Sequence, residues 1–319
     1  MKRVLRGVIL WLGLLVLPVK AAAAELIPVG QVIGLQLYND RVTVAAYDDI
    51  LGGTARSAGL KIGDQILEID GKTVACAEDV RGALQSSEGE VSLTVRRAGK
   101  ERQLRFSPAN TEDGPKMGVF LRQGIAGIGT VTFYDPASGT FGALGHGVCD
   151  SEGMLKMTRG NAFEATVAEI RKGRSGDLGQ LRGAAESPIP FAPLLKNTPQ
   201  GVFGVSPHRW QGEVLATADY ESVHTGAASI RAQIGTGQPR DYSVEILKIY
   251  PETRPDHRNF LLRVTDPDLL RITGGIVQGM SGSPILQDGK FIGAVTHVLV
   301  NDPTTGYGIF IDNMLAAAG

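Results

Sequence analysis

The sequence is poor in the residues that mark several common protein classes. Its 319 residues include only two cysteines, Cys76 and Cys149, which are too few for a disulfide scaffold, so we expect free thiols. The formal net charge is −1 and no long run has one sign, which gives no reason to expect nucleic-acid binding. Aromatic residues make up 6% of the chain, and no long helical pattern or internal repeat is present. Glycine, with 42 residues, is instead about twice its average share of ~7%. Glycines among short Val/Ile/Leu runs indicate a turn-rich, mainly β protein, long enough for two domains.

Residues 1–24 have the pattern of a signal peptide or an N-terminal anchor. Lys2, Arg3 and Arg6 form a basic start, an apolar stretch covers 7–19, and small alanines close the segment. The apolar stretch is short for a bilayer span of about 20 residues, although the alanines extend it, so cleavage and retention both stay open. In either case we expect the bulk of the chain to work outside the cytoplasm.

The first folded unit is predicted over residues 27–108. Strands are expected at 32–37 and 41–46, and an Asp-Gly turn ends a further strand near residue 70. A helix is predicted over 77–85, followed by a closing hairpin over 91–106.

This unit resembles a PDZ domain of the bacterial kind, most specifically over residues 58–71. PDZ domains bind an extended peptide as an added strand beside a helix. The resemblance implies that Ile33, Gly34 and Leu35 supply the turn that binds the peptide carboxylate, and that Val80 and Leu84 line the groove. Val80 and Leu84 could equally be ordinary core residues at helical spacing.

A polar segment over 109–116 is predicted to be the linker, and residues 117–319 the second domain. The second domain contains a glycine-framed serine, Ser281, in the run Gly279–Pro284 (GMSGSP), followed by a predicted hairpin. The amides of Gly279 and Ser281 could stabilise the oxyanion that forms during acyl transfer. The run looks like the Gly-x-Ser-Gly-Gly-Pro nucleophile loop of chymotrypsin-like serine proteases, with Ser283 in place of the second glycine. A glycine-rich hairpin without chemistry is the alternative.

His146 is the predicted general base. It lies between Gly145 and Gly147 after an apolar strand, about 135 residues before Ser281, which is the span that a two-barrel protease needs. His297 could compete as the base, but it falls within an apolar strand and is expected to pack or to form hydrogen bonds.

Asp266 is the predicted third member of a catalytic triad, because a carboxylate can hold the imidazole in the tautomer that accepts the serine proton. It ends a predicted strand 15 positions before Ser281, so it could also simply start a turn before Pro267. Asp150 and Asp177 are the rival carboxylates.

Four segments together look like the SpoIVB peptidase family, the stage IV sporulation protein B group. They cover residues 142–147, 264–267, 274–284 and 294–308. The resemblance implies a PDZ domain followed by a chymotrypsin-like double β-barrel, with His146 as base, Ser281 as nucleophile and Asp266 as the proposed third residue. It also implies self-cleavage near the N-terminus and cleavage of a membrane-bound regulator of an intramembrane protease, in the space between mother cell and forespore.

The hypothesis is therefore an exported serine endopeptidase without a cofactor. The main alternative is an exported peptide-binding PDZ adaptor whose protease-like domain is inactive. A metal site at His146 and Cys149 is the weakest possibility, because these two ligands have no matching second pair in the sequence.

Overall fold

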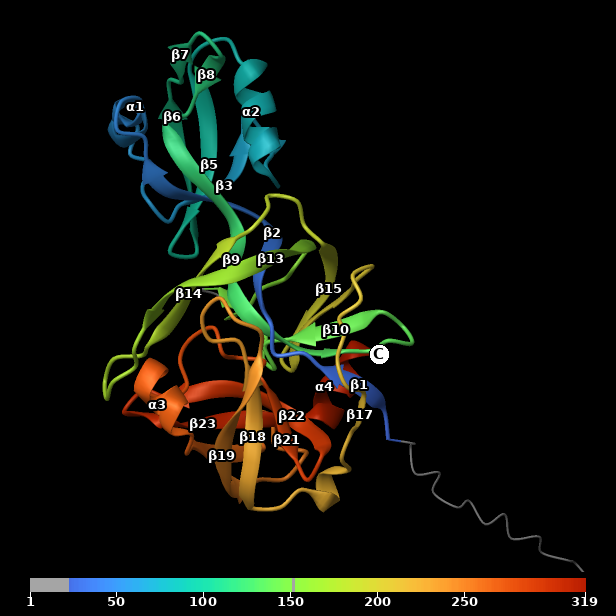
Figure 1. Cartoon of the computed structure of the whole chain (residues 1–319). Helices are drawn as coiled ribbons and strands as arrows, with labels where there is room; N and C mark the ends of the chain where they lie inside the picture. The colour runs from blue at the N-terminus through green and yellow to red at the C-terminus, as the bar shows by residue number, and fades with distance from the viewer. Residues whose placement is uncertain (1–22, 151–152) are drawn as a thin grey trace, which may run out of the picture.

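The computed structural model describes residues 23–150 and 153–319 (Figure 1). All but the last two residues of the predicted signal or anchor segment, 1–24, lie outside the described residues. Within the described ranges, no helix is both long enough and apolar enough to cross a bilayer. Strands dominate the molecule, and the predicted mainly β fold is confirmed.

The first barrel is a ring of paired strands. Following the pairings from β9 through β10, β16, β15, β13 and β2 leads back to β9. Its interior is filled by buried side chains that include Ile33, Leu35, Val131 and Phe141. The strands are β2 (Val32–Tyr47), β9 (Val119–Tyr134), β10 (Thr140–Ala143), β13 (Arg159–Arg171), β15 (Ala192–Thr198) and β16 (Gly201–Val205).

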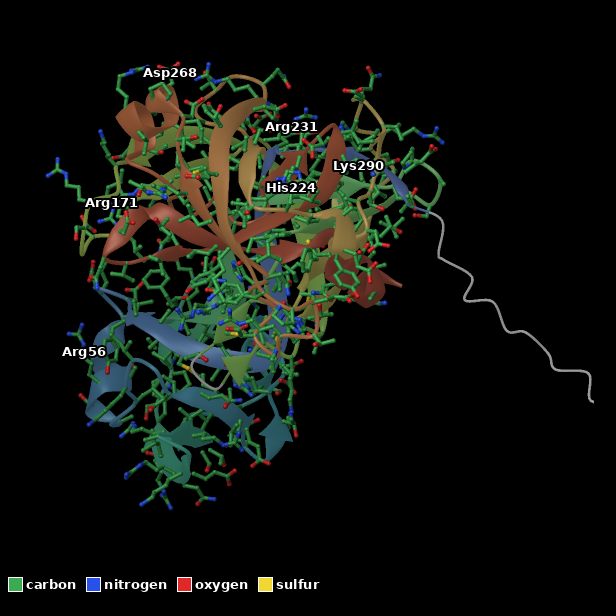
Figure 2. All side chains as sticks on the ribbon, turned by 90° about the horizontal axis from the view of Figure 1, so that it is seen from below. Arg56, Arg171, His224, Arg231, Asp268 and Lys290 are labelled. Atoms are coloured by element: carbon green, nitrogen blue, oxygen red, sulfur yellow. The ribbon has the colours of Figure 1, made fainter. Side chains whose placement is uncertain are left out.

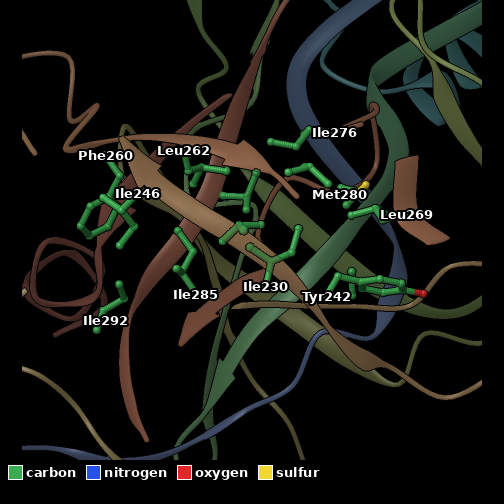
Figure 3. Close-up of a cluster of buried hydrophobic side chains, with 14 of the residues drawn as sticks. Ile230, Tyr242, Ile246, Phe260, Leu262, Leu269, Ile276, Met280, Ile285 and Ile292 are labelled. Atoms are coloured by element: carbon green, nitrogen blue, oxygen red, sulfur yellow. The ribbon is translucent and has the colours of Figure 1, made fainter. Parts of the chain in front are cut away.

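The second barrel closes in the order β18, β19, β20, β23, β22 and β21. Figure 3 shows its core, in which side chains such as Ile230, Ile246 and Phe260 converge from different strands. The strands are β18 (Gly226–Ala232), β19 (Arg240–Ile249), β20 (Phe260–Val264), β21 (Pro284–Gln287), β22 (Lys290–Leu299) and β23 (Asp302–Phe310). The predicted double β-barrel is thus present.

The PDZ unit stands apart from the barrels at one end of the molecule (Figures 1 and 2). Its sheet joins the second half of β2 to β3 (Gln65–Ile69), β5 (Val91–Arg97) and β6 (Lys100–Phe106), with the start of β9 on the other side of β2. Helices α1 (Gly52–Ser57) and α2 (Ala77–Gln85) pack on this sheet. The buried Asp64 carboxylate accepts two 2.6 Å hydrogen bonds from Arg97, an ion pair that fixes the loop before β3.

The two units share their strands, which the sequence did not indicate. β2 and β9 run without interruption from the first barrel into the PDZ unit, so residues 27–37 belong to the barrel core and not to the PDZ unit predicted over 27–108. The buried positions of β2 change from odd to even numbers across Asp40 and Arg41, but the sequence does not show that one strand continues through this break. The predicted linker 109–116 is a short hairpin of β7 (Ala109–Thr111) and β8 (Gly114–Lys116).

The remaining elements are short and lie at the edges of this framework. They are β1 (Glu25–Pro28), β4 (Lys72–Thr73), β11 (Cys149–Asp150), β12 (Gly153–Met154), β14 (Gln180–Ala185), β17 (Leu215–Ala216), the 3-10 helix η1 (Tyr220–Ser222), α3 (Pro267–Thr273) and α4 (Ile311–Ala318). Labelled charged side chains lie on the outside of both halves in Figure 2, in keeping with a near-neutral surface of mixed sign.

Candidate active site

A cavity of about 520 Å³ lies where the two barrels meet. The first barrel contributes β2, β9 and the segment after β10, and the second contributes β22 and the loop before β21. Ser281, His146 and His297 all line this cavity, whereas Asp266 does not. Most of the remaining wall is apolar: Leu35, Leu37, Ile128, Leu144, Ile276 and Val298.

The loop that carries Ser281 is held from both barrels. Met280 is fully buried in the core of the second barrel, as Figure 3 shows. From the first barrel, the Thr130 hydroxyl donates to the Gly279 carbonyl at 2.8 Å, and the Thr130 amide donates to the Ser281 carbonyl at 3.0 Å. Gly282 has a φ of +97°, and a Cβ there would lie 2.1 Å from the Thr130 carbonyl oxygen. Only glycine therefore fits this turn.

The amides of the loop alternate between bonded and open. Gln278 donates to Gly179 at 3.0 Å, Met280 to Val277 at 3.1 Å, and Gly282 to Val295 at 2.7 Å. In the described part of the chain, the intervening amides of Gly279 and Ser281 have no such acceptor. Two open amides beside a serine hydroxyl are the arrangement needed to bind an oxyanion.

The Ser281 hydroxyl is engaged by the backbone. Its Oγ donates to the carbonyl oxygen of Thr296 on β22 at 2.8 Å. A hydroxyl has a single proton to donate, so in this conformation Ser281 does not donate to an imidazole.

His146 is turned into the cavity by an unusual stretch of backbone. Leu144 and Gly145 both have positive φ, +71° and +67°, directly after β10. The His146 Nδ1 lies 3.0 Å from the Gly147 carbonyl oxygen. A carbonyl oxygen can only accept, so Nδ1 carries the proton and Nε2 keeps its lone pair. Burial lowers the pKa of His146, although the Gly147 carbonyl partly offsets the effect.

His297 lies beside His146 on β22, with ring centroids 5.1 Å apart. Burial, and next the nearby His146, lower the pKa of His297 to about 4, so its ring is neutral at pH 7. Its Nδ1 is buried without a hydrogen-bond partner among the described residues. The prediction that His297 packs or forms hydrogen bonds within a strand missed that its ring reaches the cavity.

Asp266 is the N-cap of α3 and not a partner of His146. Its Oδ1 accepts from the amides of Asp268 and Leu269 at 3.0 and 2.9 Å, and Pro267 follows in the first turn. The structure therefore contradicts the predicted third triad member and favours the alternative of a turn before Pro267.

The rival carboxylates are also engaged elsewhere. Asp150 pairs with Arg41 at 3.3 Å, and Asp177 pairs with Arg171 at 2.9 Å. The Gly147 carbonyl, which no side-chain pattern could reveal, takes the orienting position on His146.

Comparison with known families decides the class of this site. The profile of the SpoIVB peptidase S55 family matches residues 113–315, and a PDZ domain profile matches residues 50–97. The chain belongs to the SpoIVB peptidase S55 family. The resemblance seen in the sequence is confirmed, and this family member also contains a PDZ domain.

The individual relatives match only part of this chain or have low sequence identity to it. Proteins named as zinc metalloproteases in Agrobacterium fabrum and Vibrio cholerae are 41% and 31% identical to it over 88 and 128 residues. These matches cover 27% and 40% of this chain but only 22% and 27% of the relatives' own length. The Rv3671c protease of M. tuberculosis H37Rv in an inactive Ser343Ala form matches 60% of this chain and 82% of its own, at 17% identity and a TM-score of 0.34. A PDZ domain of an SdrC-like protein from Listeria monocytogenes matches 26% of this chain and 87% of its own, at 26% identity and a TM-score of 0.23.

Among the described residues, no ligand set matches the zinc chemistry in the relatives' names. The sequence has no His-Glu-x-x-His motif. In the described ranges, no three His, Cys, Asp or Glu side chains are grouped closely enough to hold a metal ion. Both cysteines are free thiols.

The peptide groove of the PDZ unit differs from the one predicted. Ile33, Gly34 and Leu35 lie near the start of β2, paired with β9 on one edge and β13 on the other, so they cannot form a carboxylate-binding turn. Val80 and Leu84 line a groove of about 690 Å³ and also belong to the buried core of the PDZ unit. The opposite wall of the groove is formed by residues 117–121, which lead into β9.

The new groove wall has the features of a peptide-binding edge. Along 119–121, β9 pairs with β2 on one side, and no strand of the described structure pairs with its other side. Gly118 precedes the edge with a φ of +69°, and Phe120 is 59% exposed. A peptide could therefore add as a strand between β9 and α2.

Proposed function

We propose that this S55 peptidase is a serine endopeptidase in which Ser281 and His146 act as a dyad. The observation that carries the proposal is that both side chains line one cavity while Nδ1 of His146 donates to the Gly147 carbonyl. That hydrogen bond leaves the Nε2 lone pair as the proton acceptor, without a carboxylate.

The proposed reaction starts when Ser281 turns from the Thr296 carbonyl toward His146. Nε2 takes the hydroxyl proton while Oγ attacks the substrate carbonyl carbon. The open amides of Gly279 and Ser281 stabilise the oxyanion, a contribution of about 3 kcal/mol per donor in other enzymes. His146 then gives the proton to the leaving amine, and water hydrolyses the acyl-enzyme by the same steps in reverse.

The biological setting is proposed from the family resemblance and from the signal-like segment 1–24. We infer export across the cytoplasmic membrane, self-cleavage near the N-terminus, and cleavage of a membrane-bound regulator of an intramembrane protease during sporulation. The PDZ groove would hold a tail of the substrate or of the enzyme itself.

The rival function is an exported PDZ adaptor with an inactive protease domain. The 2.8 Å bond from Ser281 to Thr296 favours it, because this hydroxyl is not poised on a base. Expression of the full chain and of its Ser281→Ala variant in bacterial cells that can export them separates the two functions. Removal of the segment 1–24 by a signal peptidase would occur in both chains. The peptidase predicts a further N-terminal cleavage in the parent chain that the variant lacks, with equal melting temperatures. Identical cleavage sites in both chains would contradict self-cleavage by Ser281.

A further inference from the structure

A second cleft, of about 460 Å³, lies between the PDZ unit and the first barrel. Its wall includes the guanidinium groups of Arg41, Arg96 and Arg122 and, among the described residues, a single carboxylate, that of Asp150. The catalytic cavity beside it is lined by no charged carboxylate or guanidinium side chain. The two hollows therefore differ sharply in the chemistry they offer to a bound chain.

The charges of this cleft, named here the arginine cleft, do not cancel. Arg41 pairs with Asp150 at 3.3 Å, and Arg96 pairs at 3.1 Å with Glu101, which does not line the cleft. Arg122 is exposed and has no carboxylate within 4.0 Å in the described part of the chain. The cleft thus keeps an excess of positive charge that can attract carboxylates.

The arginine cleft continues directly from the catalytic cavity. Ile125 of β9 lines both hollows. Along β2, Leu37 lines the cavity and Asn39 the cleft, and the chain passes from cavity to cleft again between Cys149 and Asp150. The register of β2 and β9 slips after Leu37, which separates the strands at the point where the cleft opens.

These positions give the distance along β9 from the edge of the catalytic cavity, at Ile125, to Arg122. Arg122 lies three residues from Ile125 along β9, or roughly 10 Å at ~3.3 Å per residue. An extended substrate that leaves the cavity over β2 and β9 would bring a residue about three to five positions from the cleaved bond to Arg122.

We propose that this peptidase selects polypeptides with an apolar residue at the cleaved bond and carboxylates about three to five residues away, on the side that runs over β2 and β9. This substrate preference rests on the proposed function. It assigns recognition to Arg122, which does not line the catalytic cavity.

The test uses peptides built on a sequence that the full-length enzyme cleaves, found by digesting a peptide library. Two Glu, two Gln or two Lys residues are placed three to five positions before or after the cleaved bond. We expect Glu to raise kcat/KM about two- to fivefold over Gln on one side only, the range for exposed ion pairs. The gain in kcat/KM should shrink at 0.5 M salt, because the Debye length is then only about 4 Å and exposed charges are screened. Equal kcat/KM for Glu and Gln peptides on both sides would overturn the proposal.

Charge reversal provides the matched comparison. Arg122→Glu should abolish or invert the preference for Glu, whereas Arg105→Glu, an exposed site on β6 outside the cleft, should leave it unchanged. If both variants lose the preference for Glu equally, the preference follows from net charge alone and the assignment to Arg122 is wrong. If no peptide is cleaved, the peptidase proposal fails by itself. Binding of fluorescent peptides to the Ser281→Ala variant, measured by fluorescence anisotropy, then tests the preference for carboxylates by itself. Equal affinities for the Glu and Gln peptides would overturn that preference.

Discussion

The hydroxyl of Ser281 donates a 2.8 Å hydrogen bond to the carbonyl oxygen of Thr296, on the strand that forms the far wall of its own cavity. This bond keeps the hydroxyl off His146, whose Nε2 is left as an acceptor by the bond from Nδ1 to Gly147. The nucleophile and the base therefore line one cavity but are not hydrogen-bonded to each other in this conformation. The proposed mechanism requires the serine side chain to turn toward His146, and apo enzymes often hold such contacts loosely.

Substitution of Asp266 separates a helix cap from a catalytic carboxylate. Asp266→Asn keeps a good N-cap, so we expect kcat and stability to stay close to the parent values. Asp266→Ala should lower the free energy of unfolding by about 1 kcal/mol, again with kcat preserved. Urea unfolding and peptide cleavage measure the two effects. A loss of about 10⁴ in kcat for Asp266→Asn, as expected for a triad carboxylate, would restore the triad.

The activity should persist into mildly acidic solution. His146 must be neutral to accept the serine proton, and burial lowers its pKa below the ordinary value of 6.5. The acid limb of kcat/KM should therefore have its midpoint below pH 6.5, measured with a peptide that has no titrating group in that range. A midpoint clearly above 6.5 would show that a carboxylate or another negative charge stabilises the imidazolium.

The free energy of unfolding should decrease as the solution becomes more acidic, because of His297. Its folded-state pKa is about 4, below the ordinary 6.5, so the unfolded chain binds more protons between these values. The contribution of the neutral ring is complete above about pH 6.5 and is lost as the pH falls toward 4. His297→Gln removes this titration, so its melting temperature should fall less than that of the parent between pH 7 and 4.5. If the melting temperatures of the two proteins change equally with pH, the lowered pKa of His297 is contradicted.

The PDZ groove can be tested at Phe120. Its exposed ring lies at the edge of β9 in the groove beside α2, so Phe120→Ala should weaken binding of apolar-ended peptides by roughly 1 kcal/mol, or about fivefold. Ile62→Ala, a similarly exposed side chain outside the groove, serves as the control and should bind as the parent does. Calorimetry on the Ser281→Ala background measures both. A larger loss at Ile62 than at Phe120 would place the groove elsewhere.

Gly282 and Gly289 give a matched pair for the nucleophile loop. Both have positive φ, +97° and +72°, but only at Gly282 would a Cβ meet backbone, at 2.1 Å from the Thr130 oxygen. Gly289→Ala should cost about 1 kcal/mol of stability with activity retained. Gly282→Ala should cost more than about 2 kcal/mol and abolish activity, since the clamp on Ser281 must move. Equal costs would show that Thr130 does not constrain the loop.

The sequence predicted those features that depend on local pattern. The glycines around Ser281 and His146 marked positions of tight backbone, and the structure places both side chains in one cavity. Periodicity also located most strands and the helix α2. The mainly β class followed from the glycine content and the short apolar runs.

What the sequence could not show are contacts made by the backbone and by strands that cross between units. Gly147 orients His146 through a carbonyl, which every residue has, so no residue type marks it. The segments 32–37 and 41–46 look like two strands of one unit in the sequence, whereas both belong to β2, whose first part lies in the barrel; Ile33–Leu35 were therefore misplaced in the groove. Asp266 before Pro267 fits an N-cap and a triad equally well in sequence, and only the position of α3 separates them.

Covalent labelling with a fluorophosphonate probe tests the central claim most directly, because the probe reacts only with an activated serine. The full-length protein is treated with the probe, and the modified residue is located by mass spectrometry, with His146→Gln as the comparison. The account predicts labelling of Ser281 in the parent protein and at least about 100-fold slower labelling in the variant, from loss of the base. Absence of labelling at Ser281 in the parent protein, or equal labelling in both proteins, would contradict it.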